Sequence, residues 1–351
     1  MRVLLTTPYD LAVPGGVNQH ALGLLDALAR RSVEVMLIGP TSTPFQSGTR
    51  RILALGRVRV GELNGARSRV TLDFSIRTKI RDAMRAFRPD VVHLQEPFLP
   101  ILNTFALGYA GAARRIGTFH TYSETSRGYL WSWPWCQAIL QRLDGRIAVS
   151  AAAMSFATRY HAAPFDLVRH GITLPEEHDC RPPLPCATPM RVLFVGRADE
   201  PRKGYAILER AMQVLQRELP GAFALRAVGP GTPGGEVTPA ELAGAYRDAD
   251  VCVVPSLGGE SFGLVALEAL AAGLPVIASR IAGYKEWLET AEVGGLTEPG
   301  SPTALATALK RLRASPGEYL QCAQRARAVA REYSWDDCVD RHLAVYAETT
   351  S

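Results

Sequence analysis

Lysine and long apolar segments are both scarce in this chain. Only four of its 39 basic residues are lysine, at positions 79, 203, 285 and 310. No run of about 18 apolar residues occurs, so the sequence predicts no membrane-spanning helix. The apolar start at 2–5 turns polar at Thr6, which is too soon for the core of a signal peptide. These absences argue against a membrane bundle and predict a cytoplasmic protein.

Cysteine is present, but not in a metal-binding pattern. Six cysteines occur and none forms C-x-x-C. The closest two, Cys180 and Cys186, lie with His178 in a proline-rich stretch, and a second closely spaced ligand pair is missing. We therefore expect reduced thiols and no metal site.

The excess of positive charge is small. Basic residues number 39 and acidic residues 34, which gives a net charge of +5. This does not indicate a nucleic-acid binder, and no nucleic-acid partner is expected. A hydrophobic fraction of 47% over 351 residues predicts a globular protein with a large core. At about 150 residues per domain, the length suggests two domains.

Short apolar segments alternate with helical patterns through the first half of the chain. A helix is expected over 17–31, where apolar residues recur at helical spacing. Strands are expected at 3–5, 33–38, 91–94, 116–119 and 145–149. This alternation is typical of a parallel sheet covered by helices.

A proline-rich segment at 170–189 interrupts the pattern. Its five prolines exclude a long helix or a central strand, so it is interpreted as a linker. The alternation then restarts, with strands expected at 190–195, 222–228, 251–254 and 275–278, and helices at 205–218, 239–247, 262–272 and most of 302–348. The fold class is therefore α/β, with two Rossmann-like domains, 1–169 and 190–332. Ligands bind beyond the carboxyl ends of such strands, so we expect a cleft between two facing edges.

Two loops could hold an anion at these strand ends. Gly15 and Gly16 precede a helix, so the backbone can approach a ligand and helix N–H groups can face an anion, although an ordinary strand–helix turn looks the same. The loop 196–204 carries several cations after a strand. Arg197 and Lys203 could hold a diphosphate and stabilise the charge that develops when a bond breaks. The alternative is a solvated basic loop.

A third loop, 258–268, is rich in glycine and carries two carboxylates. Residues 262–264 can offer backbone N–H groups to a phosphate. Glu260 and Glu268 are eight residues apart, which is about 12 Å along a helix. A glycosidase pair needs about 5–9.5 Å. The spacing instead suits a sugar and a ribose at opposite ends of one ligand, and helix capping is the plainer alternative.

Two further features complete the set. His120 follows the strand 116–119, at the edge expected to face the cleft, although a lone histidine is more often structural. The segment 229–234 matches the dinucleotide fingerprint G-x-G-x-x-G. Its two prolines and the absence of a helix directly after it argue against a dehydrogenase.

Together these motifs resemble those of GT-B glycosyltransferases of family 4. The resemblance covers nearly the whole chain and rests on features in the expected order: Gly15, Gly16, His120, Arg197, Lys203, Glu260 and Glu268. The segments 13–16, 200–204 and 257–263 look most similar to the bacterial phosphatidylinositol mannosyltransferase branch.

The resemblance implies a GT-B fold and a retaining transfer of a hexose, mannose or glucose, from a nucleotide-diphosphate sugar. GDP-mannose is favoured over UDP-glucose by the branch alone. A C-terminal helix within 333–351 would cross back onto the first domain, with a plain terminal helix as the alternative. No tightly bound cofactor is implied, and Mg²⁺ can accompany the diphosphate.

The resemblance also implies residue roles. The Gly16 N–H would bind the distal phosphate, Arg197 and Lys203 would neutralise the leaving diphosphate, and His120 would touch the sugar near the reacting carbon. Glu260 would bind the hexose and Glu268 the ribose. Other donor contacts are implied at Gly15, Ser261, Phe262, Gly263 and Leu264. The chain departs from the family after Gly229, where a helix and a strand are missing, so base contacts cannot be carried over.

A basic amphipathic segment at 74–88 is a candidate for membrane contact. Apolar residues line one side: Ile76, Ile80, Ala83, Met84 and Phe87. Five cations oppose Asp82: Arg77, Lys79, Arg81, Arg85 and Arg88. Such a helix can dock on anionic lipid, or it can simply pack on the sheet.

Further residues are candidates for acceptor or membrane contact: Tyr9, Asn64, Arg67, Arg69, Trp131 and Trp133. The tryptophans could equally be local core. Leu63 lacks an aromatic hydroxyl, and Thr125 stands where the family has a basic residue, so the acceptor need not be phosphatidylinositol.

Three hypotheses follow. The first is an enzyme peripheral on the inner face of the cell membrane, which glycosylates phosphatidylinositol or a diacylglycerol-type glycolipid. The second keeps the donor and takes a soluble sugar or small metabolite as acceptor. The third is a non-catalytic nucleotide-sugar-binding protein, in which His120→Ala and Glu260→Ala would leave cellular function intact.

Overall fold

The structure is a computed structural model that describes residues 1–44, 48–63, 66–124, 132–175 and 189–348. It divides into two units. Unit 1 is Met1–Gly171 with Trp335–Ser351, and unit 2 is Ile172–Ser334. Most of the expected linker, 176–188, lies outside the described residues.

Unit 1 is built on a seven-stranded sheet in which every strand pair is parallel. In spatial order its strands are β3 (Ile52–Ala54), β2 (Glu34–Gly39), β1 (Arg2–Thr6), β6 (Val91–Gln95), β7 (Arg114–Phe119), β8 (Gly145–Ala148) and β9 (Asp166–Leu167). All five residues of β6 are buried, as expected for a strand covered on both faces. An antiparallel hairpin, β4 (Val58–Leu63) and β5 (Ala66–Thr71), joins the loop after β1 through a bridge between Tyr9 and Val70.

The helices of unit 1 are α1 (Gly16–Arg30), α2 (Ile76–Phe87), α3 (Leu102–Gly108), α5 (Trp133–Leu140), α6 (Ala151–Tyr160) and α13 (Trp335–Ala347). Helix α2 occupies most of the expected amphipathic segment. Its apolar side lies in the core beside α3, with Ile76, Ile80, Met84 and Phe87 at most 4% exposed. That side is therefore not available to a membrane, and the cations of α2 are what it presents to solvent.

Unit 2 is built on a five-stranded parallel sheet. In spatial order its strands are β11 (Phe223–Val228), β10 (Met190–Val195), β12 (Val251–Val254), β13 (Val276–Ser279) and β14 (Gly294–Thr297). Its helices are α7 (Tyr205–Glu218), α8 (Pro239–Asp248), α9 (Leu264–Ala271), α10 (Ala282–Leu288), α11 (Pro302–Ala314) and α12 (Pro316–Arg331), with a 3₁₀ turn η2 (Pro201–Lys203). None of the helices in the described ranges is both long and apolar enough to cross a membrane.

The chain runs from β11 to α8 through a single loop, with no helix or strand between them. Gly229 and Gly231 both have positive φ, and added Cβ atoms would lie 2.2 Å from Gly196 O and 2.8 Å from Asp199 N. These glycines pack the loop onto the start of the 196–204 loop. No helix opens directly after them, so the dinucleotide reading of 229–234 is wrong.

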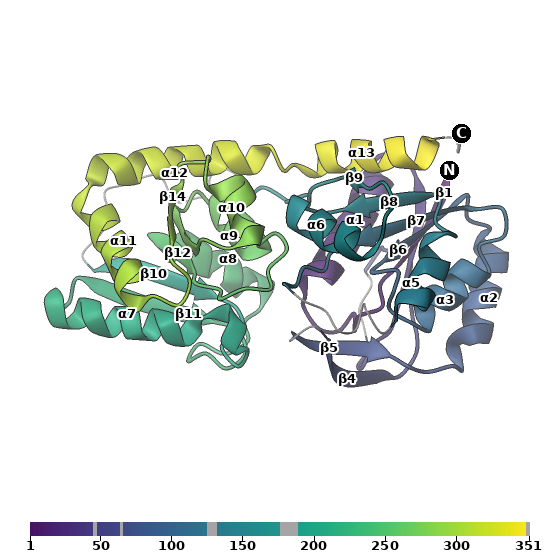
Figure 1. Ribbon diagram of the computed structural model, residues 1–351, viewed down its shortest axis with the longest axis horizontal. Coiled ribbons are helices and arrows are strands. Elements are labelled where there is room, and N and C mark those ends of the chain that lie inside the picture. The colour runs from purple at the N-terminus through teal and green to yellow at the C-terminus, as the bar shows by residue number, and fades with distance from the viewer. Residues whose placement is uncertain (45–47, 64–65, 125–131, 176–188, 349–351) are drawn as a thin grey trace. The chain divides into compact units, whose positions relative to one another are not determined.

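The C-terminal helix α13 belongs to unit 1 and lies beside α1 (Figure 1). The indole of Trp335, the first residue of α13, packs against two glycines, Gly23 and Gly171. A Cβ added at Gly23 would lie 2.0 Å from the indole, and one at Gly171 would lie 2.4 Å from it. A side chain at either glycine would overlap the ring, so glycine at both positions lets Trp335 pack where α13 begins.

We expect Gly23→Ala to lower the free energy of unfolding of unit 1 by about 1–3 kcal/mol, because the added methyl overlaps the Trp335 ring. Gly108→Ala is the matched control, since a Cβ at that helical glycine meets nothing within 4 Å. Thermal melts and hydrogen exchange of α13 peptides provide the measurement. Equal stability of the two variants would refute the packing role of Gly23.

Candidate active site

The carboxyl ends of three adjacent strands, β1, β6 and β7, gather polar side chains at one edge of unit 1. His120 follows β7 and is 6% exposed. Its backbone N–H donates to Glu96 Oε1 (2.8 Å), and its Nε2 is 2.7 Å from Gln95 Oε1. Gln95 accepts from a protonated Nε2, so the remaining proton-free atom is Nδ1, which is buried and has no hydrogen-bond partner among the residues that the structure describes.

His120 is one of five histidines in a single buried cluster. The others are His20, His93, His170 and His342. The His20 ring centroid lies 5.0 Å from that of His120 and 4.9 Å from that of His170. Tyr346 of α13 reaches the same cluster, with its hydroxyl 2.6 Å from His93 Nδ1. Helix α13 thus supplies part of the wall behind His120.

Burial keeps these imidazoles neutral. It lowers the pKa of His20, His93 and His120 well below the usual value, with repulsion among the histidines as a second cause. It lowers the pKa of His170 to about 3 and that of His342 to about 4. His120 therefore acts as a neutral hydrogen-bonding ring at neutral pH.

The loop after β1 brings further candidates to this edge. Tyr9 is partly buried, and burial followed by the charge of Glu96 raises its pKa well above the usual value. Arg69 lies 3.6 Å from the buried Asp10 carboxylate, and its backbone carbonyl accepts from the Asp10 N–H. Gly15 and Gly16 are exposed at the start of α1, and the cap residue Gly15 offers no side-chain acceptor to the first N–H groups.

In unit 2 the cations expected to hold a diphosphate are engaged by carboxylates. Lys203 Nζ is 2.5 Å and Arg202 Nη1 is 2.9 Å from the same oxygen, Glu260 Oε1. Arg197 pairs with Asp199 (3.1 Å) and with Glu200 (3.2 Å). The loop 196–204 and Glu260 therefore form one network in which each positive charge is matched. An anion that enters has to compete with carboxylates for these cations.

The two carboxylates of the third loop are not on one helix. Helix α9 begins at Leu264 after Gly263, whose φ is +94°, and a Cβ at Gly263 would lie 2.3 Å from Tyr284. Glu260 precedes this break, so the helical-rise estimate between Glu260 and Glu268 is wrong. Phe262 is likewise outside the helix. The break leaves the N-terminus of α9 without a side-chain cap, which suits an anion.

Both carboxylates have protein partners. The Tyr246 hydroxyl of α8 donates to Glu268 Oε2 (2.8 Å). Ser261 and the backbone of Glu260 pack on Gly283, where a Cβ would lie 2.2 Å from Glu260 O. Trp287 Nε1 donates to Phe262 O (2.9 Å), and the two rings stack with centroids 5.1 Å apart. The loop is thus fixed by contacts within unit 2.

Several acceptor and membrane candidates cannot be placed. Asn64, Trp131, Thr125 and the side chain of Arg67 lie outside the described part of the chain, as do Cys180, Cys186 and His178. Trp133 is 49% exposed at the start of α5. Lys79 is exposed, Arg77 donates to the Tyr109 hydroxyl (2.8 Å), and Arg81 pairs with Asp82 (2.9 Å).

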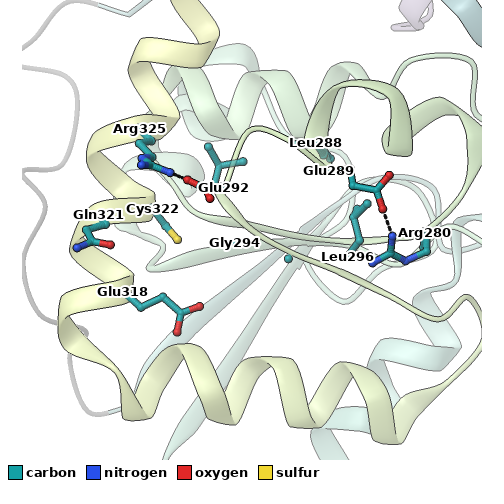
Figure 2. A pocket seen from close by; sticks show the side chains of 12 residues that line it. Arg280, Leu288, Glu289, Glu292, Gly294, Leu296, Glu318, Gln321, Cys322 and Arg325 are labelled. Carbon is teal, nitrogen blue, oxygen red and sulfur yellow. Dashed lines mark hydrogen bonds and ion pairs between the residues drawn. The ribbon is translucent and has the colours of Figure 1, made fainter.

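A hollow of about 560 Å³ lies elsewhere in unit 2, beside β14, α10 and α12 (Figure 2). Its charged side chains are paired across it, Arg325 with Glu292 and Arg280 with Glu289. None of the residues implied in donor or acceptor binding lines it.

Among the residues that the sequence pattern did not single out are Gln95, Glu96, Asp199, Tyr246 and the four histidines that surround His120. Gln95 and Glu96 directly follow the strand expected at 91–94, so asking what succeeds each buried strand would have found them. Tyr246 lies 22 residues from Glu268 along the chain, and no local signal links the two.

Comparison with known proteins assigns both halves of the chain. Two family models match, "Glycosyltransferase Family 4" over 14–174 and "Glycosyl transferases group 1" over 189–315. The chain is 32% identical to a phosphatidyl-myo-inositol mannosyltransferase of Mycobacterium leprae, over 99% of this chain and 96% of that protein. It is 29% identical to a D-inositol 3-phosphate glycosyltransferase of Xylanimonas cellulosilytica, over 96% and 92% of the two chains.

A solved sucrose-phosphate synthase from Thermosynechococcus elongatus has a similar structure. Its TM-score is 0.74 at 23% identity, and the match covers 98% of each chain. The expected GT-B fold, with two parallel-sheet α/β units, is therefore confirmed.

The histidine cluster predicts acid sensitivity. In the unfolded chain the histidine side chains have a pKa of about 6.5. In the folded protein the pKa is lowered to about 4 for His342 and to about 3 for His170. The buried histidines therefore do not lower the free energy of unfolding above pH ~6.5. As the pH falls toward their folded pKa values, protonation of the unfolded chain lowers this free energy, by about 2 kcal/mol per fully buried histidine at pH 5.

We expect the urea midpoint of unit 1 to fall between pH 7.5 and 5, and to fall less in His342→Leu, which removes one titrating ring. Hydrogen exchange of α13 peptides along the urea series reports the midpoint. The same pH dependence in wild type and variant would contradict this account.

Proposed function

The chain belongs to family 4 of the glycosyltransferases, and on this basis we propose that it transfers mannose from GDP-mannose to an inositol-containing acceptor with retention of configuration. The observation that carries the donor half is the contact of Lys203 and Arg202 with Glu260 Oε1. The cation proposed to hold the diphosphate is thus within hydrogen-bond distance of the carboxylate proposed to bind the hexose. The mannose and inositol assignment rests on the 32% identity to a phosphatidyl-myo-inositol mannosyltransferase, with transfer of glucose from UDP-glucose as the alternative donor reaction.

On the donor side, the leaving diphosphate would displace Glu260 from Lys203 and share Arg197 with Asp199 and Glu200. Released Glu260 would then accept hydrogen bonds from hexose hydroxyls. The uncapped N–H groups at the start of α9, from Gly263 and Leu264, and the Gly16 N–H would bind phosphate oxygens. Glu268, oriented by Tyr246, would bind the ribose.

The chemistry needs charge stabilisation more than a protein nucleophile. The bond from C1 to the diphosphate oxygen breaks, the acceptor oxygen bonds to C1 on the same face, and the acceptor proton passes to the leaving phosphate. Arg197 and Lys203 stabilise the charge that develops on that phosphate. His120 is neutral, so the contact proposed for it with the sugar would add no positive charge. The described residues contain no group of His, Cys, Asp and Glu suited to a metal ion, so a magnesium ion would arrive with the donor.

On the acceptor side, Tyr9 and Arg69 lie at the same edge of unit 1 as His120. We assign the acceptor as a lipid at the inner face of the cell membrane, and cations of α2 as its electrostatic anchor. Exposed apolar side chains next to α2 support this surface, since Leu72 is 51% and Phe74 68% exposed. Contact would therefore be through charge and these side chains, and not through the apolar side of α2.

A soluble inositol phosphate is the second candidate acceptor. The likeness to a D-inositol 3-phosphate glycosyltransferase favours it, as does the burial of the apolar side of α2. Both acceptors present inositol hydroxyls beside a phosphate, so they share the binding chemistry and differ in the membrane.

Thermal-shift titration tests the donor site. We expect GDP-mannose to raise the melting temperature of the wild type, as stabilisation follows RT ln(1 + [L]/Kd). In Glu260→Gln, binding of GDP-mannose should weaken about tenfold, or about 1.4 kcal/mol. GDP alone should bind this variant at least as tightly as wild type, because Lys203 and Arg202 lose a competing carboxylate. Glu298→Gln, at an exposed position, is the control. If no nucleotide sugar stabilised the wild type, the donor assignment would be contradicted.

Vesicle flotation separates the two acceptors. Wild-type protein should bind vesicles that contain phosphatidylinositol, and binding should weaken with salt. The double variant Lys79→Glu/Arg85→Glu should bind at least tenfold more weakly, given about 1 kcal/mol per surface cation. Arg210→Glu/Arg217→Glu on α7 of unit 2 is the matched control. No salt-sensitive binding by the wild type would favour the soluble acceptor.

A further inference from the structure

Glu96 has an unusual backbone at the carboxyl edge of unit 1. It directly follows β6 and has φ +49°, a left-handed conformation that costs a non-glycine residue about 1–2 kcal/mol. Its N–H donates to Thr118 O (2.8 Å), and its carbonyl accepts from Asn103 Nδ2 (2.9 Å). The surrounding structure thus holds this residue in a strained turn, which is most common at functional sites.

The Glu96 carboxylate is buried, and its hydrogen bonds with His120 and the Thr121 hydroxyl involve only one of its two oxygens. The side chain is 3% exposed. Oε1 accepts from the His120 N–H and from the Thr121 hydroxyl, both at 2.8 Å. Both of these bonds end on Oε1. The Thr121 backbone N–H also contributes a hydrogen bond to the carboxylate, and no cation among the residues that the structure describes pairs with it. The amide oxygen of a neutral glutamine could accept both of these Oε1 bonds, so the two bonds do not require a charged side chain at this position.

The charge itself is costly here. Burial raises the pKa of the Glu96 carboxyl, although the hydrogen bonds from Thr121 and His120 oppose this. The same charge contributes to the raised pKa of the Tyr9 hydroxyl, so Glu96 faces the part of the edge that also holds Tyr9 and His120. Neither the His120 N–H nor the Thr121 hydroxyl bonds to Oε2, so a ligand that supplies a donor to this oxygen would offset part of the cost of burying the charge.

We propose that Glu96 Oε2 accepts a hydrogen bond from a ring hydroxyl of the acceptor, which makes Glu96 an acceptor-binding residue of unit 1. This assignment rests on the proposed function, because it takes a polyhydroxylated ring as the ligand. A hydroxyl bound to an ionised carboxylate makes one of the stronger hydrogen bonds in proteins. The strained turn at Glu96 and the Oε1 contacts then set the position of Oε2 relative to His120.

Glu96→Gln provides the test in the full-length chain. Glutamine keeps an oxygen for His120 and Thr121 and replaces Oε2 by a donor group. We expect the acceptor KM to rise at least tenfold, with the melting temperature and the thermal shift from GDP-mannose unchanged. In the wild type the acceptor KM should also rise as the pH falls and Glu96 takes up a proton, and this rise should be absent in the variant.

Thr121→Val is the structural control, because it removes one donor to Oε1 and leaves Oε2 in place. It should lower the melting temperature slightly and leave the acceptor KM within threefold of wild type. An acceptor KM of Glu96→Gln within threefold of wild type would overturn the proposal, since it would show that Glu96 only holds the His120 loop.

A binding measurement keeps this inference separate from the proposed function. Calorimetric titration with myo-inositol 1-phosphate, and flotation with phosphatidylinositol vesicles, distinguish the soluble and lipid sources of the ring. If the wild type binds the ring but transfers no hexose, the proposed reaction fails, and weaker binding by Glu96→Gln still supports the role of Glu96. Equal binding by both proteins, or no binding by the wild type, overturns it.

Discussion

The parallel direction of the strands is the constraint on which the candidate sites depend. In each unit all strands of the main sheet point the same way, so the loops that follow them emerge at one edge. Residues far apart in sequence, such as Tyr9, Glu96 and His120, reach the same edge of unit 1 for this reason. In unit 2 the loops after β10 and β12 bring Lys203 to Glu260. If one strand ran in the opposite direction, the loop after it would lie at the opposite edge, and its residues would no longer lie near the others.

Charge balance is the second organising feature. Arg197, Arg202 and Lys203 are each paired with carboxylates, so the proposed donor site presents no cluster of unpaired positive charge. Such a site favours a ligand that satisfies both signs at once. A nucleotide sugar would do so, because its diphosphate would replace the carboxylates and its hexose hydroxyls would engage Glu260. A simple anion would leave Glu260 without a donor, so the proposed site would favour the sugar-bearing nucleotide.

Most of the fold was predictable because its strands are short, buried and apolar, and its helices are amphipathic. The loops proposed to bind the donor could be located from sequence because glycine breaks and charged residues follow those strands directly. The error at Glu260 arose because Gly263, at positive φ, delays the start of α9 to Leu264, two residues after the start expected at 262 and four residues after Glu260. The membrane face of α2 was ambiguous, since the same apolar pattern describes packing on a core. The histidine cluster, the seat of Trp335 between Gly23 and Gly171, and the contact of Tyr246 with Glu268 join distant segments, so tertiary packing alone reveals them.

The most direct test of the central claim is the product of the reaction itself. The full-length chain is incubated with GDP-mannose labelled with ¹³C at C1 and with phosphatidylinositol vesicles or inositol phosphate, and the anomeric one-bond coupling and the released GDP are measured. The account predicts an α-mannosyl product, the configuration of the donor, with one GDP released per mannose transferred. A β-linked product would contradict retention, and hydrolysis without transfer to either acceptor would contradict the assignment as a whole.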